Sequence, residues 1–313
     1  MADQRPPEAS SASADGYAVI AVNYASHQLL QQNLEPSTSS NSRATIIVVD
    51  NFSSDAELDA VTGLCQSNDW VLLPRPNDGF GAGMNTGVAH AISLGLSVFV
   101  LINPDLHADA QSLDALADQA VSHPDTLTAP RILRPDGSLW FAGGVVCLED
   151  GTTKTKEGTD STQPNGWLTG ACLSVHLDLW SRLGGFDDDY FLYWEDVDLS
   201  WRCRALGGHL AVRRDITVVH SVGGTQQATG KSPLYYYYNC RNRLLFARKH
   251  LDLPTRRRWI RRSPSVARLI VLRGGKRQFL STPWKPIQAA IAGTVAGLRS
   301  PQSAFPRVRR TRP

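Results

Sequence analysis

The sequence predicts an α/β protein in which helices flank an open, mostly parallel β-sheet. The first half of the chain alternates short apolar runs, rich in β-branched residues, with segments of helical periodicity, which is typical of parallel strands joined by crossover helices. With 313 residues, of which 42% are hydrophobic and 19% charged, the chain is long enough to bury a substantial core. We therefore expect one large α/β domain with a smaller appendage.

The expected strands and helices follow one another along this half. Apolar runs predict strands at residues 17–22, 45–49, 70–73 and 98–102, and helical periodicity predicts helices at 28–34, 56–66 and 83–94. In an open α/β sheet the ligand binds beyond the carboxyl ends of the strands. Polar residues fall at or just past these ends, namely Asn23, Asp50, Asn77 and Asp105. We therefore expect a ligand site at this edge.

A glycine-rich stretch, GFGAGMNTG at 79–87, is expected to form a loop that leads into the third helix. Backbone N–H groups in such a loop can approach a nucleotide closely. The stretch matches neither the GxGxxG pattern nor a P-loop, because Met84 takes the place of the last glycine and no Lys-Ser/Thr pair follows. On its own it is weak support for a nucleotide site.

Acidic and aromatic residues meet in the segment 184–208, GGFDDDYFLYWEDVDLSWRCRALGG. A glycine pair ends a helical segment at 177–183, and Glu195 and Asp196 begin a second helix that closes at another glycine pair. Carboxylates at a helix N-terminus can serve simply as caps. Four aromatic rings beside them, however, are typical of a sugar-binding surface with a poised base. We expect the catalytic residues here.

Charge is distributed unevenly along the chain. From Arg241 to the end the sequence has 19 Lys and Arg residues and one acidic residue, whereas the preceding 240 residues have 13 Lys and Arg and 28 acidic residues. A basic tail suits nucleic acid, an anionic membrane face or a phosphorylated lipid, and charge alone does not choose among them. Because apolar runs at 269–272 and 287–298 accompany the arginines, the tail is predicted to lie on an anionic cytoplasmic membrane face.

Cysteine usage and the N-terminal residues bear on the compartment. The five cysteines are scattered and form no CxxC pair, which favours a reducing cytosol over a disulfide framework or a zinc site. Residues 1–15 are polar and predict a disordered leader, and no apolar run approaches the ~20 residues that span a bilayer. We expect a catalytic domain at 16–222, then a lid loop and a basic helical region at 223–313 that binds acceptor or membrane.

Several short motifs occur in a fixed order across residues 17–246. They are VNY at 22–24, VVDN at 48–51, GFGAGMNTG at 79–87, INPD at 102–105, WLTGAC at 167–172, the acidic segment, His220 and CRNRLLF at 240–246. In these motifs and their order the chain resembles inverting family 2 glycosyltransferases with the GT-A fold, particularly the rhamnosyltransferase and galactofuranosyltransferase-like branch. The resemblance implies a Rossmann-like, mixed and mostly parallel sheet with a basic helical C-terminal extension.

The resemblance implies a nucleotide-sugar donor site at the strand ends. Asp50 matches a residue that contacts the nucleotide base, although from the residues alone it is equally a turn residue, and Asn85 matches one that helps to hold the nucleoside. The donor-site residues implied in this way are Val22, Asn23, Tyr24, Asp50, Asn77, Gly79, Asn85 and Asn103.

The resemblance also implies a divalent metal cofactor, Mn²⁺ or Mg²⁺. GT-A enzymes usually place Asp-x-Asp where this chain has INPD, so Asn103 takes the first position and only Asp105 is charged. Without the resemblance, INPD is a Pro-containing turn and a lone His after a strand is more often structural. In relatives a metal-binding His stands at the place of His220, and Asp105, His220 and two diphosphate oxygens would form a suitable shell.

Asp196 is the expected catalytic base, with Glu195 as its rival. A carboxylate that takes the acceptor proton typically contributes about 10²–10⁴ in rate. A helix N-terminus lowers the pKa of a carboxylate, so burial among aromatic rings must raise it again for a good base. Arg241 and Arg243 either face the diphosphate or solvate their helix. The expected acceptor-binding residues are Trp167, Thr169, Gly170, Tyr193, Trp194 and Arg241.

The implied activity is inverting transfer of a sugar, rhamnose by the resemblance, from a dTDP- or UDP-sugar to a glycan or polyprenyl-diphosphate-linked acceptor in cell-surface polysaccharide synthesis. The expected location is cytoplasmic, on the inner face of the plasma membrane, with no nucleic-acid partner. The sequence lacks QxxRW, the motif of processive synthases, which favours transfer of a single sugar in each encounter with the acceptor. Two alternatives stay open: a sugar nucleotidyltransferase, whose basic glycine-rich loop residues 21–27 lack, and a nucleic-acid-binding protein, which the acidic body disfavours.

Overall fold

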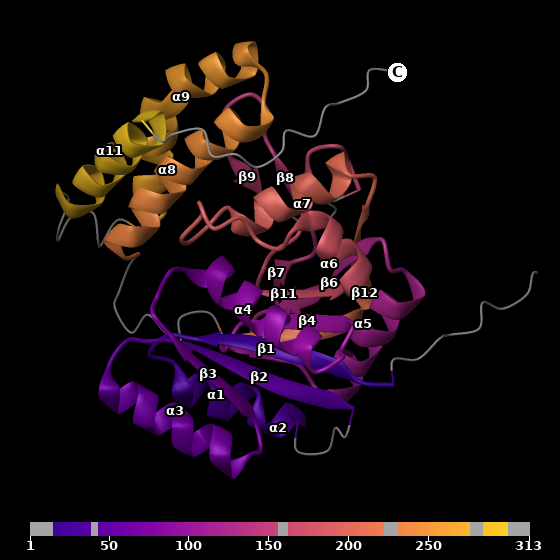
Figure 1. Cartoon of the computed structure of the whole chain (residues 1–313). Coiled ribbons are helices and arrows are strands. Elements are labelled where there is room, and N and C mark those ends of the chain that lie inside the picture. Colours follow the sequence, from indigo (N-terminus) through magenta and orange to yellow (C-terminus); the bar gives the residue numbers. More distant parts are fainter. Residues whose placement is uncertain (1–14, 39–42, 156–161, 222–230, 276–283, 300–313) are drawn as a thin grey trace, which may run out of the picture.

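A nine-stranded mixed β-sheet runs through the middle of the molecule (Figure 1). The computed structural model describes residues 15–38, 43–155, 162–221, 231–275 and 284–299. The strands lie in the order β3 (Val71–Arg75), β2 (Ala44–Asn51), β1 (Tyr17–Asn23), β4 (Val98–Ile102), β11 (Cys172–His176), β6 (Thr126–Leu133), β12 (His209–His220) and β5 (Leu106–His107), and β7 (Leu139–Phe141) pairs with β6. A three-stranded sheet has the order β10 (Gly166–Trp167), β8 (Gly144–Val146) and β9 (Thr153–Lys154).

The large sheet is mostly parallel, as predicted. Strand β1 pairs in parallel with β2 and β4, β2 pairs in parallel with β3, and β12 pairs in parallel with β6. Strand β11 is antiparallel to both β4 and β6. The register places Asn23 opposite Asp50, so the two polar strand ends lie side by side.

Three of the four predicted strands are confirmed, and the fourth is displaced. Strand β3 begins after Trp70 and continues through Pro74 to Arg75. Proline cannot donate a hydrogen bond within a sheet, but β3 is an edge strand that pairs only with β2, so the missing N–H costs little.

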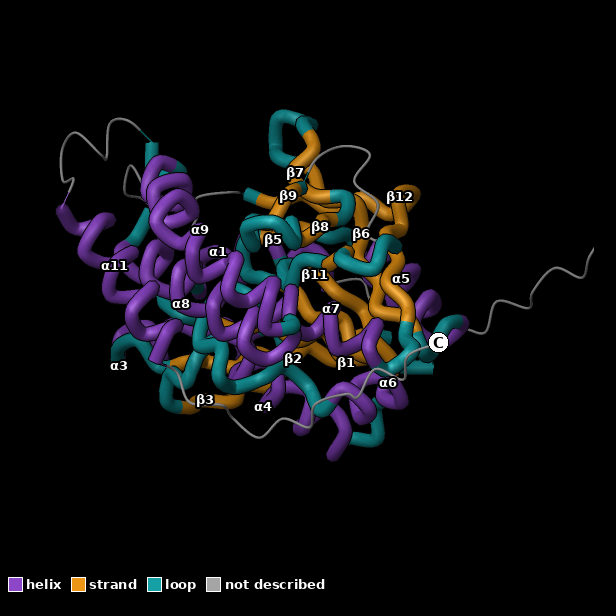
Figure 2. The backbone as a smooth tube through the Cα atoms, turned by 90° about the horizontal axis from the view of Figure 1, so that it is seen from above, coloured by secondary structure: helices purple, strands orange, loops and turns teal. Residues whose placement is uncertain are grey.

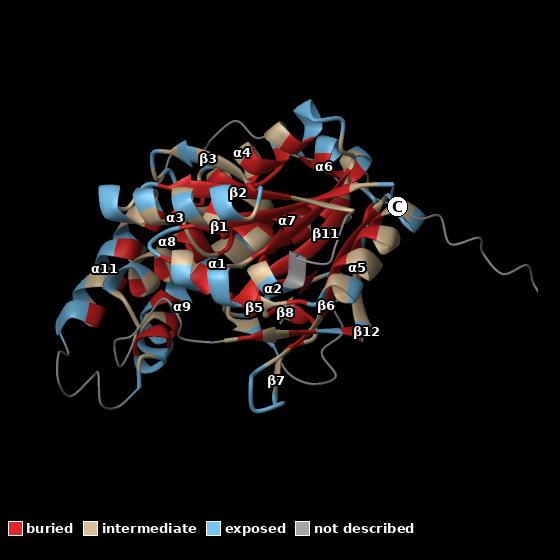
Figure 3. Cartoon of the chain, turned by 90° about the horizontal axis from the view of Figure 1, so that it is seen from below, coloured by how far each residue is buried: buried red, intermediate tan, exposed pale blue. Residues whose placement is uncertain are grey.

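Helices cover both faces of the sheet. In Figure 1, α4 (Phe80–Ser93), α6 (Leu177–Leu183) and α7 (Glu195–Ala205) lie above it, and α1 (His27–Asn33), α2 (Glu35–Thr38) and α3 (Asp55–Ser67) lie below, while α5 (Ala110–Ser122) packs on β4, β6, β11 and β12. The strands between these layers form the buried core (Figure 3), and all seven residues of β1 are buried.

The glycine-rich stretch is a helix and not the expected loop, because α4 begins at Phe80. Its glycines allow the helix to pack closely. A Cβ at Gly81 would lie 2.8 Å from the Phe186 side chain, one at Gly83 would lie 2.9 Å from Val22, and one at Gly87 would overlap Ile20. The glycines within the helix therefore serve helix packing.

Three C-terminal helices gather at one end of the molecule (Figures 1 and 2). They are α8 (Pro233–His250), α9 (Leu253–Leu272) and α11 (Trp284–Arg299). Phe246 of α8 and Trp259 of α9 belong to the main core, whereas Tyr236, Val266 and Ala290 form part of a second apolar cluster among the three helices. The expected domain boundary at residue 222 stays a prediction, and the expected leader and most of the lid loop lie outside the described residues.

No helix in the described part of the chain is both long and apolar enough to cross a membrane.

Candidate active site

Two buried polar side chains meet at the carboxyl ends of β1 and β2. Asn23 Nδ2 donates to Asp50 Oδ1 over 2.7 Å, and the hydroxyl of Ser26 donates to Asn23 Oδ1. Burial raises the pKa of Asp50, and the hydrogen bond from Asn23 opposes that shift. Asp50 Oδ2 is buried and has no hydrogen-bond partner among the described residues. Because an orphaned buried acceptor is unfavourable, this oxygen suits an N–H group of a ligand.

The start of α4 connects these strand ends to the acidic segment. Gly79 has a φ of 107°, and a Cβ there would overlap the carbonyl oxygen of Phe191, so only glycine fits. Phe80 N donates to that same oxygen over 3.0 Å. Asn51 Nδ2 donates to Gly79 O, and Asn77 Oδ1 accepts from Gly79 N, so both asparagines shape this turn.

Other predicted donor-site residues differ in their surroundings. Tyr24 is 54% exposed and offers its ring to a ligand, whereas Val22 is buried beneath α4. Asn85 donates to Phe186 O and Asp188 Oδ1 and accepts from Phe186 N. The amide of Asn85 therefore positions the acidic segment, and its expected contact with the nucleoside stays a prediction.

Asp105 and His220 face each other across the end of the sheet. Asp105 follows β4, and His220 ends β12, which pairs with β5 just beyond Asp105. His220 Nε2 lies 3.0 Å from Asp105 Oδ1, yet neither atom makes a hydrogen bond within the described chain. Asn103 Oδ1 is likewise buried without a partner.

The spacing of this pair fits a shared metal ion. Two ligands of an octahedral ion with bonds of about 2.1 Å lie roughly 3.0 Å apart when they are adjacent, which is the observed separation. The described residues contain no group of three or more His, Cys, Asp and Glu side chains that could hold an ion. Among the described carboxylate, imidazole and thiol side chains, an ion at this place would therefore have two ligands, Asp105 and His220.

Trp140 was not predicted and lies against the His220 ring. The ring centroids are 4.2 Å apart, with an interplanar angle of 51°. The indole restricts how the imidazole can turn and thereby helps to direct Nε2 toward Asp105. No sequence motif surrounds Trp140, and it comes within reach of His220 only through the pairing of β7 with β6.

Asp196 lies in the first turn of α7, with both carboxylate oxygens held by backbone N–H groups. Gly170 N donates to Oδ2 over 3.0 Å, and Val197 N donates to Oδ1 over 2.8 Å. Burial raises the pKa of Asp196 to about 6, even though these N–H groups act to lower it. The carboxylate is therefore mostly ionised at neutral pH and has a pKa near the range that favours general-base catalysis.

Glu195, the rival base, has a different environment. Its side chain is buried, packs beside Gly81 of α4, and leaves Oε2 without a hydrogen-bond partner. Burial, followed by the charge of Asp196, raises the pKa of Glu195 well above its ordinary value. The pKa of Glu195 is thus shifted upward by burial and by the charge of Asp196, and this separates the two carboxyl groups of the turn.

Two consecutive residues before this pair adopt the left-handed backbone conformation. Tyr193 has a φ of 66° and Trp194 a φ of 75°, which is strained for aromatic residues and typical of functional sites. Asn242 of α8 donates from its single amide nitrogen to the carbonyls of Leu192 and Tyr193, over 2.9 and 2.8 Å. Asn242, fully buried, therefore holds the turn that presents Glu195 and Asp196.

Buried ion pairs hold α7 in place. Asp198 accepts from Arg202 Nε and from His250 Nε2, both over 2.6 Å. Burial acts to raise the pKa of Asp198, but Arg202 and His250 outweigh it and lower the pKa to about 2. Lys249 forms ion pairs with Asp187 and Asp189 in the preceding loop. The Asp-x₃-Arg spacing is the one sequence signal that could have revealed part of this network.

Four of the predicted acceptor residues, Trp167, Thr169, Gly170 and Trp194, are buried. Trp194 packs between Phe246 and Trp259, Trp167 packs against Phe141, and the Thr169 hydroxyl accepts from the backbone N–H of Ala171. Trp167, Thr169 and Trp194 therefore support the site through packing and hydrogen bonding, and their expected contact with the acceptor stays a prediction. Tyr193 stays half-buried, with its ring 5.4 Å from that of Tyr235.

The two arginines of the CRNR motif have separate roles. Arg241 Nη1 donates to Asp189 O and to Asn242 Oδ1. Arg241 is half-buried beside residues 192–196, which we call the catalytic turn. Arg243 is fully buried, where it donates to the carbonyls of Asp150 and Trp259 and to the Ser263 hydroxyl. Arg243 therefore joins helices and loops, and neither of its expected roles applies.

A short backbone link makes the predicted groups one continuous site. Gly170 N contacts Asp196, and the next residue, Ala171, accepts at its carbonyl from Asn103 N over 2.8 Å. The Asp196 carboxylate and the strand end that carries Asp105 are thus separated by two turn residues, Gly170 and Ala171. The structure brings the Asp105–His220 pair and the Asp196 carboxylate into one region of the molecule.

Solved structures share this architecture. The chain aligns with GalNAc-T7 with UDP, GalNAc and Mn²⁺ at a TM-score of 0.58 and 14% identity, covering 77% of this chain and 49% of that one. It also aligns with the mannosyltransferase PcManGT from Pyrobaculum calidifontis, in complex with GDP-Man and Mn²⁺, at a TM-score of 0.55 and 16% identity, covering 93% and 90%. The fold is that of the GT-A glycosyltransferases.

Sequence relatives narrow this class. Residues 19–172 match the profile of the family described as glycosyl transferase family 2. The chain is 28% identical over 243 residues to the N-acetylglucosaminyl-diphospho-decaprenol L-rhamnosyltransferase of Mycobacterium tuberculosis, covering 69% of this chain and 78% of that protein. The chain carries a glycosyl transferase family 2 domain and is a glycosyltransferase.

Proposed function

We propose that this glycosyltransferase moves rhamnose, with inversion, from dTDP- or UDP-rhamnose to a hydroxyl of a glycan carried on polyprenyl diphosphate, in cell-surface polysaccharide synthesis. The observation that carries the proposal is the Asp196 carboxylate, which has a pKa of about 6 and lies two residues of backbone away from the Asp105 strand end. The M. tuberculosis relative, named as an N-acetylglucosaminyl-diphospho-decaprenol L-rhamnosyltransferase, supports the sugar and the acceptor.

Asp50 would bind the nucleotide base. Its buried free oxygen is an acceptor, and both uracil and thymine carry an N3–H donor, so one hydrogen bond would satisfy both partners. The exposed ring of Tyr24, one residue beyond Asn23, can stack on the flat face of a base. This arrangement supports a pyrimidine nucleotide donor.

Asp105 and His220 would hold a divalent metal, Mn²⁺ or Mg²⁺, together with two diphosphate oxygens. The pair fits such an ion because its two facing atoms lie 3.0 Å apart without a hydrogen bond. A bound divalent ion supplies positive charge that stabilises the departing nucleotide diphosphate. The Mn²⁺ in the two related structures supports this assignment.

Asp196 would take the proton from the acceptor hydroxyl. Inversion requires the acceptor oxygen to attack the anomeric carbon on the face opposite the leaving diphosphate, so the base must lie on the acceptor side. The backbone N–H groups of Gly170 and Val197 fix its orientation. Burial and the charge of Asp196 raise the pKa of Glu195, which disfavours a second negative charge beside the base.

The C-terminal helices would face the acceptor and the membrane. Arg241 and Tyr193 lie at the catalytic turn, where they can contact an acceptor glycan. The surplus of arginines in α9 supports attachment to the anionic inner face of the plasma membrane, at the cytoplasmic side. A polyprenyl-linked acceptor would be presented at that surface.

Nucleotide release from a panel of dTDP-, UDP- and GDP-sugars tests the proposal. Each donor is incubated with the full chain, with and without a polyprenyl-diphosphate-linked N-acetylglucosamine acceptor, in Mn²⁺, Mg²⁺ or EDTA. We expect release from dTDP- or UDP-rhamnose that needs acceptor for full rate and is abolished by EDTA. Preference for a GDP-sugar would refute the donor assignment, and full activity in EDTA would refute the metal site.

A further inference from the structure

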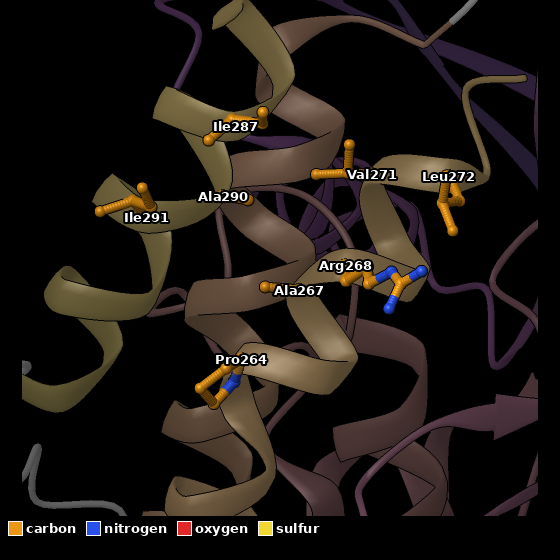
Figure 4. A pocket seen from close by; sticks show the side chains of 8 residues that line it. All are labelled: Pro264, Ala267, Arg268, Val271, Leu272, Ile287, Ala290 and Ile291. Atoms are coloured by element: carbon orange, nitrogen blue, oxygen red, sulfur yellow. The ribbon is translucent and has the colours of Figure 1, made fainter. Parts of the chain in front are cut away.

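Helices α9 and α11 leave an apolar groove between them (Figure 4). It has a volume of about 560 Å³, and it is lined by apolar side chains that include Pro264, Val271, Leu272, Ile287 and Ile291. Among the described residues of its lining, Arg268 carries the one charge. The volume falls within the range of about 300–1,000 Å³ that is common for ligand pockets.

The groove results from the way in which α11 packs. A Cβ at Gly293 would overlap the carbonyl oxygen of Tyr237, and one at Gly297 would lie 2.7 Å from the carbonyl oxygen of Arg241. These two glycines seat α11 directly on the backbone of α8. Helix α9 also packs on α8, through the second apolar cluster. Because both helices rest on α8, a channel remains between them.

Apolar side chains and unpaired charges lie at the edge of this groove. Leu272 is 48% exposed and Ile291 is 59% exposed, although both are large aliphatic residues. Arg257, Arg261 and Arg268 follow one another at helical spacings of four and seven and so share a stripe of α9. All three arginines are exposed, and none forms an ion pair with a described residue. An apolar channel beside a cationic stripe is complementary to a lipid with an anionic headgroup.

We propose that the α9–α11 groove binds the isoprenoid chain of the lipid-linked acceptor, with the arginine stripe on its phosphate groups. The inference rests on the proposed function, which requires a polyprenyl-diphosphate carrier. The groove is connected to the catalytic turn through α8. That helix contributes Tyr236 to the apolar cluster under the groove, and six residues later Asn242 holds the carbonyls of Leu192 and Tyr193. A chain bound in the groove is thereby anchored to the element that positions the base.

Isothermal titration calorimetry of the full chain with farnesyl phosphate, an isoprenoid monophosphate, tests the groove. We expect the Leu272→Ser/Ile291→Ser double variant to bind roughly tenfold more weakly, because it removes apolar contact area. Arg268→Ala should weaken binding by about threefold to tenfold through the phosphate. Val295→Ser/Leu298→Ser is the matched control, since it removes two exposed apolar residues of α11 outside the groove lining and should bind as the unaltered chain does.

Three results would overturn the inference. They are equal farnesyl phosphate affinity in the groove variant and in the unaltered chain, full displacement by inorganic phosphate, and equal or tighter binding of dodecyl phosphate, which would indicate a general lipid surface. Failure of the proposed function is distinguishable because nucleotide release measures sugar transfer, whereas calorimetry measures farnesyl phosphate binding without any nucleotide sugar. If no nucleotide sugar is turned over while farnesyl phosphate still binds and the groove variant weakens it, the transferase assignment fails and the groove stands.

Discussion

The donor side and the catalytic turn hold their functional groups by different means. On the donor side, Asn23, Asp50 and Asp105 stand at or just past the ends of β1, β2 and β4, and neighbouring strands fix their spacing. The catalytic turn instead places Tyr193 and Trp194 in a left-handed conformation, at a cost of order 1–3 kcal/mol each. A distant helix, α8, holds this turn through Asn242.

This difference suggests that the donor side and the catalytic turn respond differently to substitutions in the C-terminal helices. The carboxyl ends of these strands are rigid because hydrogen bonds to neighbouring strands hold each strand along its length. Donor binding should therefore tolerate changes in the C-terminal helices. The catalytic turn depends on side chains about 50 positions later in the chain, namely Asn242, Lys249 and His250. Contacts that move α8 can therefore alter the base without altering the donor site.

Replacement of Asp196 should separate the two halves most strongly. We expect Asp196→Asn to lower the rate of transfer by about 10²–10⁴, because the amide cannot accept a proton. Binding of dTDP or UDP, measured by calorimetry, should change by less than about twofold. Asp178→Asn is the control, since that carboxylate is 73% exposed on α6. Equal loss of nucleotide binding and transfer would show that Asp196 is mainly structural.

His220→Ala tests the donor side in the same way. We expect Mn²⁺ affinity in the presence of dTDP to fall at least about tenfold, because one of two protein ligands is lost. Electron paramagnetic resonance of free Mn²⁺ measures this directly. His209→Ala provides a matched control, because His209 begins the same strand and its side chain is 70% exposed. Unchanged Mn²⁺ binding in His220→Ala would make the Asp105–His220 contact an ordinary ion pair.

Asn242→Ala should disturb the catalytic turn alone. Loss of its amide leaves the carbonyls of Leu192 and Tyr193 without their donor, so we expect kcat to fall about tenfold and the free energy of unfolding to fall by about 1–3 kcal/mol. The KM for donor should stay within about twofold. Asn239→Ala, one turn earlier on α8, removes a bond to Tyr235 O within the helix and serves as the control. A donor KM that rises as much as kcat falls would contradict the division into two halves.

The sequence predicted the donor side better than the catalytic turn, for a physical reason. Buried parallel strands have a local signal, an apolar run that ends in a polar residue, so Asn23, Asp50 and Asp105 were placed correctly at one edge. The glycine-rich stretch misled because glycine serves loops and close helix packing equally, and only the neighbours of Gly81 and Gly83 decide between them.

Contacts between distant segments could not be predicted. The roles of Asn85 and Asn242 depend on partners about 100 and 50 residues away, and a side-chain amide gives no local sign of its partner. Trp194 was expected at the acceptor because aromatic residues suit both sugars and cores, and its packing against Phe246 and Trp259 depends on residues of α8 and α9 that are distant in the sequence. The groove between α9 and α11 likewise depends on how Gly293 and Gly297 seat one helix on another.

The smallest expected effect is the pH dependence of transfer, and it distinguishes the two acidic residues of the turn. If Asp196 is the base, kcat/KM should rise with pH to about half of its plateau near pH 6, because the carboxylate must be ionised and burial raises its pKa to about 6. If Glu195 were the base, the midpoint would follow the pKa of Glu195, which burial and the charge of Asp196 raise well above its ordinary value.

Stability should change in the opposite direction to activity. The pKa of Asp196 in the folded chain, about 6, lies above the ordinary value of 3.8, so its contribution to stability is complete below about pH 4 and is lost as the pH rises through about 6. Asp196→Asn removes this contribution. The Tm of the unaltered chain should therefore fall relative to the Tm of the variant as the pH rises across that range. A constant difference in Tm from about pH 4 to about pH 7 would show that Asp196 has an ordinary pKa. Burial at the left-handed turn would then not raise the pKa of the base.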